Sequence, residues 1–522
     1  MDSVSSTASI SPQEITKAAL QERSKLRKAL NRFHLVFFFI TTIVILDTIG
    51  AVANNGAQAF TWLALLALLF FIPFGLLTAE LGSAFPQEGG PYVWPRLAFG
   101  RVVGALNTVV YWASNPIWVG GSLTIVAISV YRQFFGAVQG AGQYVFGLAF
   151  IWLVVLCAVL SLRTGKWVPT IGAWARMALL GFFTITVVIY ALKHGVHGFG
   201  PGAFRPTWGI FIASVPLLVF NYAGFELPSS AGEEMSDPRR DVPVAVAVAA
   251  ISTVVLYMVP ILAILIVLPT NQVTSLGGFI AAIKTVFVVY GGHITPAGPV
   301  LSGAGALLGD IAAALFIFVL FSGGAVWIIG SDRDLAVAAY DGAGPRTLGR
   351  FSKRFGTPIP VNLMSGALAT SVMVLAFLLT NGNAAKYFSA VLAVAISTTL
   401  ISYIAIYPAL IKLRYSRPDV PRPYRIPGPG NVGAWIVGLL VSGWAILASM
   451  ALLWPGFGTS DPNASLPAGF AGQRLQYELS QFLPLLFLAA VGVSFYFAGK
   501  RTRREVVSSL ERPRVSADLE GT

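Results

Sequence analysis

Charged residues are scarce in this chain of 522 residues. Asp, Glu, Lys and Arg together make up 11% of it, whereas a soluble domain carries about 25%. Hydrophobic residues account for 56%, and apolar segments of roughly 20 residues, the length that crosses a bilayer core, recur along the whole sequence. This composition excludes an ordinary soluble domain and indicates a polytopic α-helical membrane protein.

Cysteine and the common catalytic motifs are also lacking. The single cysteine, Cys157, cannot form an internal disulfide, and its apolar surroundings predict a buried, inert thiol. The sequence contains no Walker loop, no Gly-x-Ser-x-Gly elbow and no His-Glu-x-x-His motif. His194 and His197 have no Cys or carboxylate neighbours, so we interpret them as part of an external loop. We therefore predict no enzymatic activity, no cofactor and no metal.

The apolar segments predict twelve membrane spans. Their ranges are 33–56, 58–80, 102–131, 143–162, 168–192, 207–232, 243–268, 303–330, 360–380, 386–412, 432–454 and 479–498. The span at 102–131 is long and contains Pro116, which predicts a tilt or a bend. Residues 1–32 are polar and basic, and no cleavable signal is visible in them.

The net charge of +13 has a topological explanation. With the N-terminus inside and the spans alternating, 28 of the 35 Lys and Arg residues lie on the cytoplasmic side and 6 on the external side, with Arg176 inside a span. This asymmetry follows the positive-inside rule and predicts two cytoplasmic termini. It favours anionic lipid as a partner over nucleic acid. We predict a multi-pass plasma-membrane protein, with composition favouring a bacterial inner membrane.

The sixth span contains a polar interruption. Within residues 216–243, Asn221, Gly224, Glu226 and Pro228 lie where a spanning helix tolerates them least. Backbone groups freed at that depth need a protein-lined or wet cavity. A carboxylate there is by default a functional hypothesis.

The first span has a matching interruption. Asp47, Thr48 and Gly50 follow an apolar run that covers about 20 Å, past the membrane midplane. Two broken spans in opposite-facing halves predict an inverted-repeat secondary transporter with its substrate at the breaks. Half-helix N-termini suit a carboxylate and unwound carbonyls suit an ammonium group, which favours a zwitterionic amino acid. The alternative is that the glycines and prolines only permit kinks or close packing.

Four further segments carry a resemblance to a known family. They lie at residues 79–94, at 224–226 with 233–243, at 331–342 with 357–360, and at 413–428. In this order and at these topological positions they resemble the amino acid–polyamine–organocation superfamily of permeases. Residues 71–80 are most similar to its glutamate/γ-aminobutyrate antiporter-like and polyamine-permease branches. The resemblance implies a five-plus-five inverted repeat with two accessory helices, and amino acid or polyamine transport.

The predicted fold is therefore an all-α integral membrane protein with 12 transmembrane helices. They form a 5+5 inverted repeat (LeuT-like) with broken helices 1 and 6. The predicted regions are a basic cytoplasmic tail at 1–32, a transport core at 33–412, a basic cytoplasmic loop at 413–431, accessory helices at 432–498 and a second basic tail at 499–522.

The candidate substrate site combines the two breaks with the third span. The predicted substrate-binding residues are Asp47, Thr48, Ile49, Gly50, Ala51, Trp112, Asn115, Asn221, Tyr222, Ala223, Gly224 and Phe225. Family members commonly carry a Gly-Ser-Gly run at the first break, and this chain does not. Capture of a substrate carboxylate by residues 48–51 is therefore a hypothesis, and Asp47 adds a negative charge that can hold an ammonium group.

Ion coupling or gating is assigned to Arg176, Glu226 and Asp310. Many sodium-independent relatives have Lys where this chain has Arg176, at a position resembling a sodium site. Arg176 lies near mid-depth and needs a carboxylate or broken-helix carbonyls, with Asp47 the first expected partner. Because arginine does not deprotonate in proteins, we predict sodium-independent transport, with any proton coupling through Asp47, Glu226 or Asp310. A purely structural role for Arg176, and a solvated helix-mouth position for Asp310, are the alternatives.

These observations predict a secondary active transporter that moves an amino acid by alternating access, as a proton symporter or an exchanger. The expected partners are a small-molecule substrate, protons or a counter-substrate, and membrane lipid. A polyamine permease, a transporter-like nutrient sensor and a channel are the alternatives. Charged residues at the cytoplasmic ends of spans are expected to form an inner gate or to brace loops, namely Glu80, Glu88, Asp332, Arg333 and Asp334.

Overall fold

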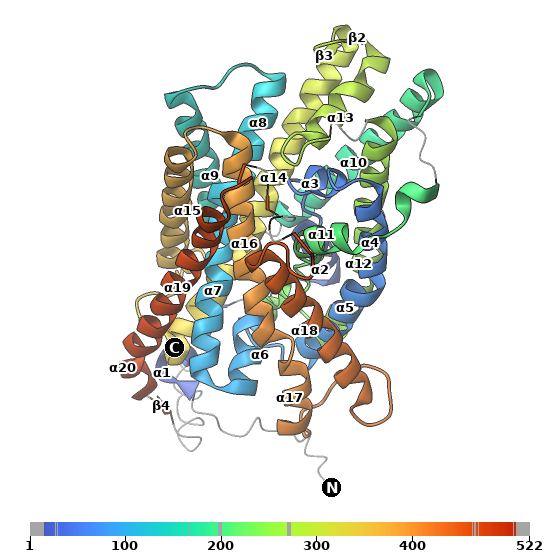
Figure 1. The fold of residues 1–522 in the computed structure, drawn as a ribbon. Coiled ribbons are helices and arrows are strands. Elements are labelled where there is room, and N and C mark those ends of the chain that lie inside the picture. Colours follow the sequence, from blue (N-terminus) through green and yellow to red (C-terminus); the bar gives the residue numbers. More distant parts are fainter. Residues whose placement is uncertain are drawn as a thin grey trace.

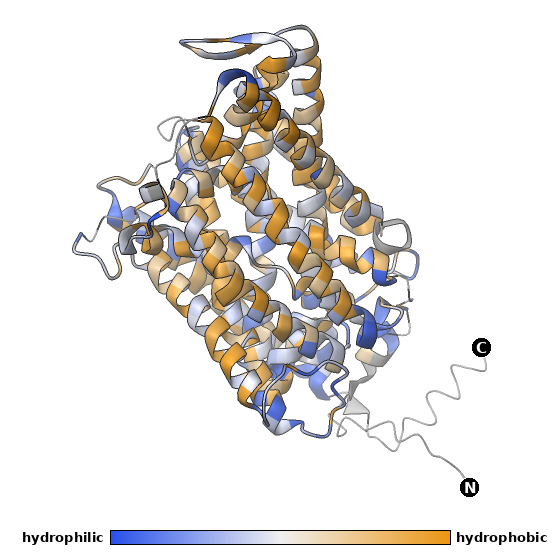
Figure 2. Cartoon of the chain, turned by 90° about the vertical axis from the view of Figure 1, so that its right-hand side faces the viewer, coloured by the Kyte–Doolittle hydropathy of each residue, from blue (hydrophilic) through white to orange (hydrophobic). Residues whose placement is uncertain are grey.

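Helices that cross one tall bundle make up nearly all of the computed structural model (Figure 1). The structure describes residues 15–507, apart from 24, 27, 29, 166, 197–200, 269–272, 462, 464–465, 468 and 505. Within these residues, ten helical segments are long and apolar enough to cross a membrane. Figure 2 shows the apolar surface running along the helices, with the hydrophilic residues concentrated towards the ends.

The membrane-length segments are built from helices that often follow one another directly. They are α4 (Ala57–Leu66), η1 (Ala67–Phe71) and α5 (Ile72–Ala84); α7 (Arg101–Trp118), η2 (Val119–Leu123) and α8 (Thr124–Phe134); α9 (Ala141–Gly165); α10 (Trp167–His194); α12 (Pro238–Val267); α14 (Gly303–Ala338) and η7 (Ala339–Ala343); α15 (Ile359–Leu379); α16 (Ala384–Ile406) and α17 (Ala409–Ser416); α18 (Val432–Leu453); and α19 (Arg474–Ala498) and α20 (Lys500–Arg504).

Shorter elements complete the fold. The helices are α1 (Lys17–Arg23), α2 (Arg32–Ile43), α3 (Ile49–Ala53), α6 (Gly90–Phe99), η3 (Pro201–Phe204), α11 (Trp208–Asn221), η4 (Leu227–Glu234), α13 (Gly278–Phe287) and η6 (Val288–Tyr290). The strands are β1 (Ile15–Thr16), paired antiparallel with β4 (Val506–Val507), and β2 (Gly292–Thr295), paired antiparallel with β3 (Gly298–Leu301).

Both predicted helix breaks are present. The first span stops at the end of α2 and resumes as α3, with residues 44–48 outside any helix. The sixth span stops at the end of α11, and residues 222–226 lead into the 3₁₀ turn η4. Gly224 in the second break has a φ of 120°, a conformation that glycine adopts without steric cost. With these two broken segments, the helices follow the predicted order of spans, and the total of twelve crossings remains a prediction.

The structure adds features that the hydropathy pattern does not show. The predicted external region after α12 contains the helix α13 and the hairpin of β2 and β3. The chain continues as helix through Pro116 into the π-helical turn η2, which changes the hydrogen-bond register after the proline. Helix α14 continues beyond the predicted end of the eighth span at residue 330, to Ala338.

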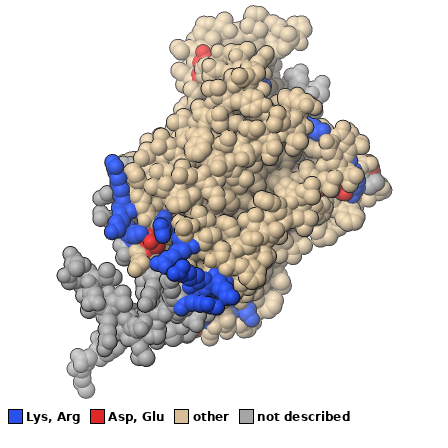
Figure 3. Space-filling model, turned by 90° about the vertical axis from the view of Figure 1, so that its left-hand side faces the viewer, with Lys and Arg blue, Asp and Glu red and all other residues tan. Residues whose placement is uncertain are grey.

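The two ends of the bundle differ in charge. We call the end that carries α6, α17, α20 and the paired strands β1 and β4 the basic end (Figure 1). Figure 3 shows Lys and Arg side chains clustered towards one end of the molecule, beside a broad surface with few charges. The opposite end carries α13 and the hairpin of β2 and β3.

Candidate functional site

A polar face of α7 runs past both helix breaks. Steps of three or four residues, which keep side chains on one side of a helix, connect its members. They are Tyr111, Ser114, Asn115 and Trp118 on α7 and Ser122 in the turn η2 that continues it. All five are buried. This face supplies hydrogen-bond donors to the carboxylates of both breaks.

Asp47 in the first break is held by this face. One oxygen of its carboxylate, Oδ2, accepts a 2.9 Å hydrogen bond from Trp118 Nε1 and a second bond from the Ser122 hydroxyl. The other oxygen, Oδ1, is buried and has no partner among the described residues. Asp47 therefore presents one free acceptor in a dry environment, which is costly unless a ligand or a proton satisfies it.

The carbonyl groups at the first break are occupied by protein donors. Trp327 Nε1 donates to Thr42 O at 2.9 Å. The Tyr257 hydroxyl donates to Ile43 O and accepts from Ile45 N, both at 2.7 Å. These contacts replace the helical hydrogen bonds that the break removes, so the interruption is stable in the absence of a ligand.

Arg176 occupies a nest of oxygen atoms beside the same break. Its guanidinium donates to Val44 O at 2.8 Å, to Gly172 O and Ser322 Oγ at 2.9 Å each, and to Val319 O at 3.0 Å. The expected interaction with broken-helix carbonyls is therefore present. The expected pairing with Asp47 is wrong, because within the described part of the chain Arg176 makes no ion pair. Three carbonyl groups and the Ser322 hydroxyl stabilise its charge instead.

Glu226 in the second break joins three spans. Its Oε1 accepts hydrogen bonds of 2.9 Å from the hydroxyls of Tyr111 on α7 and Tyr403 on α16. Its Oε2 accepts a 3.2 Å bond from Gly224 N within the break. Glu226 is fully buried, so these neutral donors are what keep a carboxylate tolerable at this depth.

The other predicted residues of the sixth span divide into two groups. Asn221 is fully buried and neither polar atom of its amide has a partner among the described residues. Tyr222 instead donates to Leu63 O at 3.0 Å, and Phe225 stacks on Phe71. Asn221 therefore has unused hydrogen-bonding capacity, whereas Tyr222 and Phe225 pack against the second span.

A small cavity lies where the two breaks approach each other. Its volume is about 10 Å³, which is room for about one water molecule. It is lined by Ile45, Ser114, Asn115, Trp118, Phe220, Trp327 and Thr399. Of the substrate-binding residues predicted from the sequence, Asn115 lines this cavity. Residues 47–51 and 221–225 do not line it, although Ile45 lies within the first break and Phe220 lies in the last turn of α11, just before the second break.

Two predicted residues lie away from this cavity. Trp112 donates to Asp332 Oδ1 at 2.9 Å and to Ser365 Oγ at 2.8 Å, so it belongs to a buried polar cluster of α7, α14 and α15. Its predicted role as a wall of the pocket does not match this position. Asp310 is half-buried in the first turns of α14, at the end opposite the basic end.

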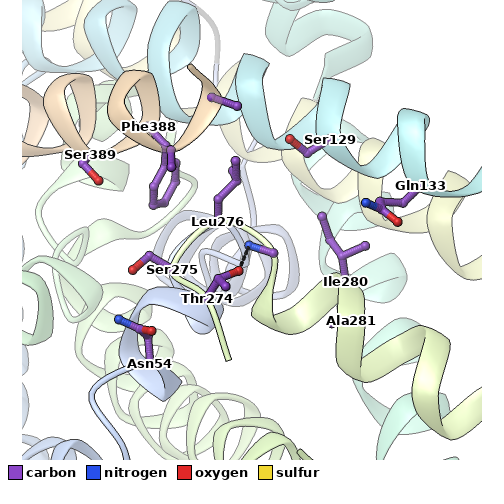
Figure 4. A pocket seen from close by; sticks show the side chains of 13 residues that line it. Asn54, Ser129, Gln133, Thr274, Ser275, Leu276, Ile280, Ala281, Phe388 and Ser389 are labelled. Atoms are coloured by element: carbon purple, nitrogen blue, oxygen red, sulfur yellow. Dashed lines mark hydrogen bonds between the residues drawn. The ribbon is translucent and has the colours of Figure 1, made fainter. Parts of the chain in front are cut away.

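A much larger pocket opens at the end opposite the basic end (Figure 4). Its volume is about 700 Å³. The described residues that line it are uncharged: Asn54, Ser129, Gln133, Thr274, Ser275, Leu276, Gly277, Ile280, Ala281, Ala384, Ala385, Phe388 and Ser389. They come from the residue after α3, from α8, from α13 and the segment before it, and from α16. We call this pocket, which is formed by several helices, the vestibule.

Buried ion pairs close the basic end. Arg333 on α14 donates to Glu88 at 2.7 Å and to Glu234 at 2.9 Å, and all three side chains are buried. Arg414 makes a double hydrogen bond to Glu80, at 2.5 Å for each contact. Three of the charged residues that we predicted to form an inner gate or to brace loops, Glu80, Glu88 and Arg333, therefore form ion pairs with residues distant in the sequence.

The geometry defines a class of protein: a multi-pass helical membrane protein with a small central cavity beside two broken helices, a separate larger pocket at one end and buried ion pairs at the other. Comparison with known proteins agrees with this class. The family model described as amino acid permease matches residues 30–469. The chain therefore belongs to the amino acid permease family.

Curated relatives cover most of the chain. An uncharacterized transporter of Legionella pneumophila is 29% identical over 437 residues, which covers 83% of this chain and 90% of that protein. A probable agmatine/putrescine antiporter of Lactococcus lactis is 27% identical, covering 78% and 84%. A branched-chain amino acid permease of Bacillus subtilis is 25% identical, covering 85% and 93%.

Solved structures share the fold. A manganese transporter of Eremococcus coleocola superposes with a TM-score of 0.56 at 11% identity, covering 95% of this chain and 98% of that chain. At this identity the likeness concerns the fold alone. The chain therefore shares the all-helical fold of that protein over nearly its whole length.

Proposed function

We propose that the protein is a secondary transporter that moves an amino acid across the membrane by alternating access. The observation that carries the proposal is the unused hydrogen-bonding capacity at the two breaks. Asp47 Oδ1 and both amide atoms of Asn221 are buried without partners among the described residues. Neither residue lines the small cavity, so the proposal brings them to the substrate only after the surrounding side chains move apart. An ammonium group would then satisfy Asp47 Oδ1, and the Asn221 Nδ2 atom would offer a donor to a carboxylate.

The conformation supports a transport cycle. The vestibule at one end and the ion pairs at the other correspond to a state that opens away from the basic end. We infer from the positive-inside rule that the basic end faces the cytoplasm, so this state faces outward. The central cavity has room for about one water molecule. The side chains around it must therefore move apart before a substrate fits.

Arg176 supports transport without sodium. Its four acceptors are oxygens of the kind that coordinate a cation, and they come from the first break, from α10 itself and from α14. The guanidinium fills the space among them and carries a permanent positive charge. We therefore propose that Arg176 replaces a coupling sodium ion. Coupling to a proton or to a counter-substrate is then carried by other groups, with Asp47 and Glu226 the central candidates.

A diamine is the second candidate substrate. Trp118, Phe220 and Trp327 all line the cavity, and aromatic faces attract organic cations. Asp47 adds a carboxylate beside them. The similarity to a probable agmatine/putrescine antiporter supports the same substrate class. An amine without a carboxylate would use the aromatic rings and Asp47 and leave the Asn221 donor unused.

The experiment is uptake and counterflow in proteoliposomes made with the full chain. Labelled amino acids and diamines are compared in sodium-free buffer, with unlabelled competitors of both classes. Saturable counterflow of an amino acid that diamines fail to compete supports the leading proposal, and the reverse pattern supports the diamine. A strict sodium requirement would overturn the role of Arg176. Equal movement of all solutes without counterflow would overturn carrier transport. A dependence of uptake on an imposed pH gradient separates proton symport from exchange.

A further inference from the structure

A second pocket lies at the basic end, outside the transport pathway described above. Its volume is about 330 Å³, within the range of small-ligand sites. It is lined by Arg414, Pro418, Val420, Arg422, Arg425 and Asn431. These residues belong to α17 and to the loop that connects it to α18, so the pocket lies where the helices leave the membrane.

The pocket carries more positive than negative charge. Arg414 and Arg422 both contact one carboxylate, that of Glu80, with Arg422 Nε at 3.3 Å from it. Among the described residues, Arg425 forms no ion pair with Glu80 and lines the pocket beside them. Three guanidinium groups therefore face one buried anion. The pKa of Arg422 is lowered by burial, and although Glu80 raises it, Arg414 and Arg425 lower it further. The arginines repel one another, and a second anion would relieve that repulsion.

Donors remain for such an anion. The exposed Arg425 donates to Gly430 O at 2.8 Å, which uses one of its five N–H groups. The Nη1 atom of Arg414 has only long contacts of 3.4 Å with Gly430 O and Asn431 Oδ1. Arg422 has less to offer, because it already donates to backbone carbonyls on its own loop. Arg425 and Arg414 are therefore the groups available to a ligand.

An apolar stripe begins beside the pocket. Asn431 immediately precedes α18, on which Val432, Trp435, Ile436 and Leu439 are exposed. Their spacing of three, four and seven residues places them on one face of the helix. Trp435 Nε1 donates to the Tyr415 hydroxyl at 2.9 Å. Exposed Trp and Tyr side chains of this kind mark the depth of the lipid headgroups.

We propose that this pocket binds the phosphate of an anionic phospholipid, with the acyl chains lying along the exposed face of α18. The arginines match the geometry of phosphate oxygens, which accept paired N–H bonds from guanidinium groups. The apolar stripe favours a lipid over a soluble phosphate compound, because a soluble compound has no acyl chain to pack against it. The bound headgroup would connect the end of α5, through Glu80 and Arg414, to the loop before α18.

The test measures lipid binding to the purified, delipidated full chain. Phosphatidylglycerol and phosphatidylcholine are titrated separately in mixed micelles, and thermal unfolding and native mass spectrometry report binding. Inorganic phosphate and glycerol phosphate are titrated as soluble anions. The variant Arg425→Gln removes an exposed donor of the pocket, and Arg239→Gln, exposed on α12 at the same end, is the matched control.

Phosphatidylglycerol should stabilise the protein more than phosphatidylcholine does. Arg425→Gln should raise the half-saturating phosphatidylglycerol concentration by about fivefold, the effect of one basic residue near an anionic headgroup, while Arg239→Gln leaves it unchanged. Equal stabilisation by both lipids, or an equal loss of phosphatidylglycerol affinity in both variants, would overturn the proposal. Either result would indicate attraction of anionic lipid to the basic end as a whole. Full stabilisation by inorganic phosphate would overturn the lipid and assign the pocket to a soluble anion. Failure of transport in proteoliposomes does not affect these outcomes.

Discussion

Replacing Arg333 with glutamine should open the basic end of the bundle. Arg333 lies on α14 and binds Glu88, which follows the second span, and Glu234, which follows the sixth. It also donates to Gly356 O at 3.1 Å. For the basic end to open in the proposed transport cycle, α14 must separate there from the segments that carry Glu88 and Glu234. Arg333 is therefore a contact between the two parts that must separate.

The size of the effect follows from burial. Arg333, Glu88 and Glu234 have exposed side-chain fractions of 1%, 0% and 4%. Removing one partner of such a buried pair costs about 3–5 kcal/mol, because the remaining charge is left without compensation. When the basic end opens, the two carboxylates reach water, so the cost falls on the closed state. Since about 1.4 kcal/mol corresponds to a tenfold change in an equilibrium, the ratio of closed to open molecules should fall by roughly 100-fold or more.

Cysteine labelling measures this ratio. The only native cysteine is Cys157, so the variant Cys157→Ser has no thiol to react. Adding Ser114→Cys to this variant places a single thiol at the central cavity. A membrane-impermeant thiol reagent is applied to vesicles of each orientation. In Arg333→Gln, labelling from the basic end should rise and labelling from the vestibule should fall. Arg474→Gln is the control, since its partly exposed pair with Glu478 is worth less than about 1 kcal/mol.

The result that refutes this reasoning is an unchanged labelling pattern in a folded variant. Size exclusion and thermal unfolding establish that Arg333→Gln is folded, and Arg333→Lys, which keeps the charge, provides a second variant with a smaller expected shift. If Arg333→Gln and Arg474→Gln label alike from both sides, the ion pairs at the basic end do not hold it closed.

Three further substitutions test the central site. Gly172→Ala should destabilise the protein by about 1–3 kcal/mol, because a Cβ there would lie 2.6 Å from the Ser322 hydroxyl, whereas Gly181→Ala on the same helix meets open space and should be neutral in thermal unfolding. Tyr111→Phe removes a donor to Glu226 and should lower stability by about 1–3 kcal/mol; an unaltered melting temperature contradicts a structural role for this bond. Asp47→Asn keeps the side-chain shape but removes the charge. The apparent affinity for substrate, measured by substrate-induced thermal stabilisation, should fall at least about tenfold, which corresponds to the loss of a charged hydrogen bond. Full affinity in Asp47→Asn would exclude a charge-assisted bond to substrate.

The breaks could be predicted from the sequence because their signals are local. Gly224 and Pro228 weaken a helix wherever they occur, and a polar pair such as Asp47 and Thr48 inside an apolar run is visible without knowledge of any neighbour. The structure places the first interruption at residues 44–48, which include Asp47 and Thr48 but not Gly50, and the second at residues 222–226, which include Gly224 and Glu226. Composition and the spacing of apolar segments likewise identify the class of fold.

Side-chain partners could not be predicted in the same way. Depth along the membrane normal is one coordinate, whereas a contact also depends on how each helix is rotated. Arg176 and Asp47 have similar predicted depths, yet Arg176 binds Val44 O and α14, and Asp47 binds Trp118 on α7 and Ser122 on η2. One available signal was missed. The spacing of Ser114, Trp118 and Ser122 at intervals of four residues marks a polar helix face that sequence alone reveals.

The position of Trp118 connects substrate binding to the first break. Its indole ring lines the central cavity, and its N–H group holds Asp47. The cavity has room for about one water molecule, so an amino acid or a diamine must displace the surrounding rings, including that of Trp118. Such a displacement removes a donor from Asp47 just as a substrate ammonium group arrives to replace it. Because the carbonyls of Thr42, Ile43 and Val44 already have protein donors, Asp47 is the group of this break whose hydrogen bonding changes most with occupancy. We propose that substrate binding and movement of the first span are thereby linked through the Asp47 side chain.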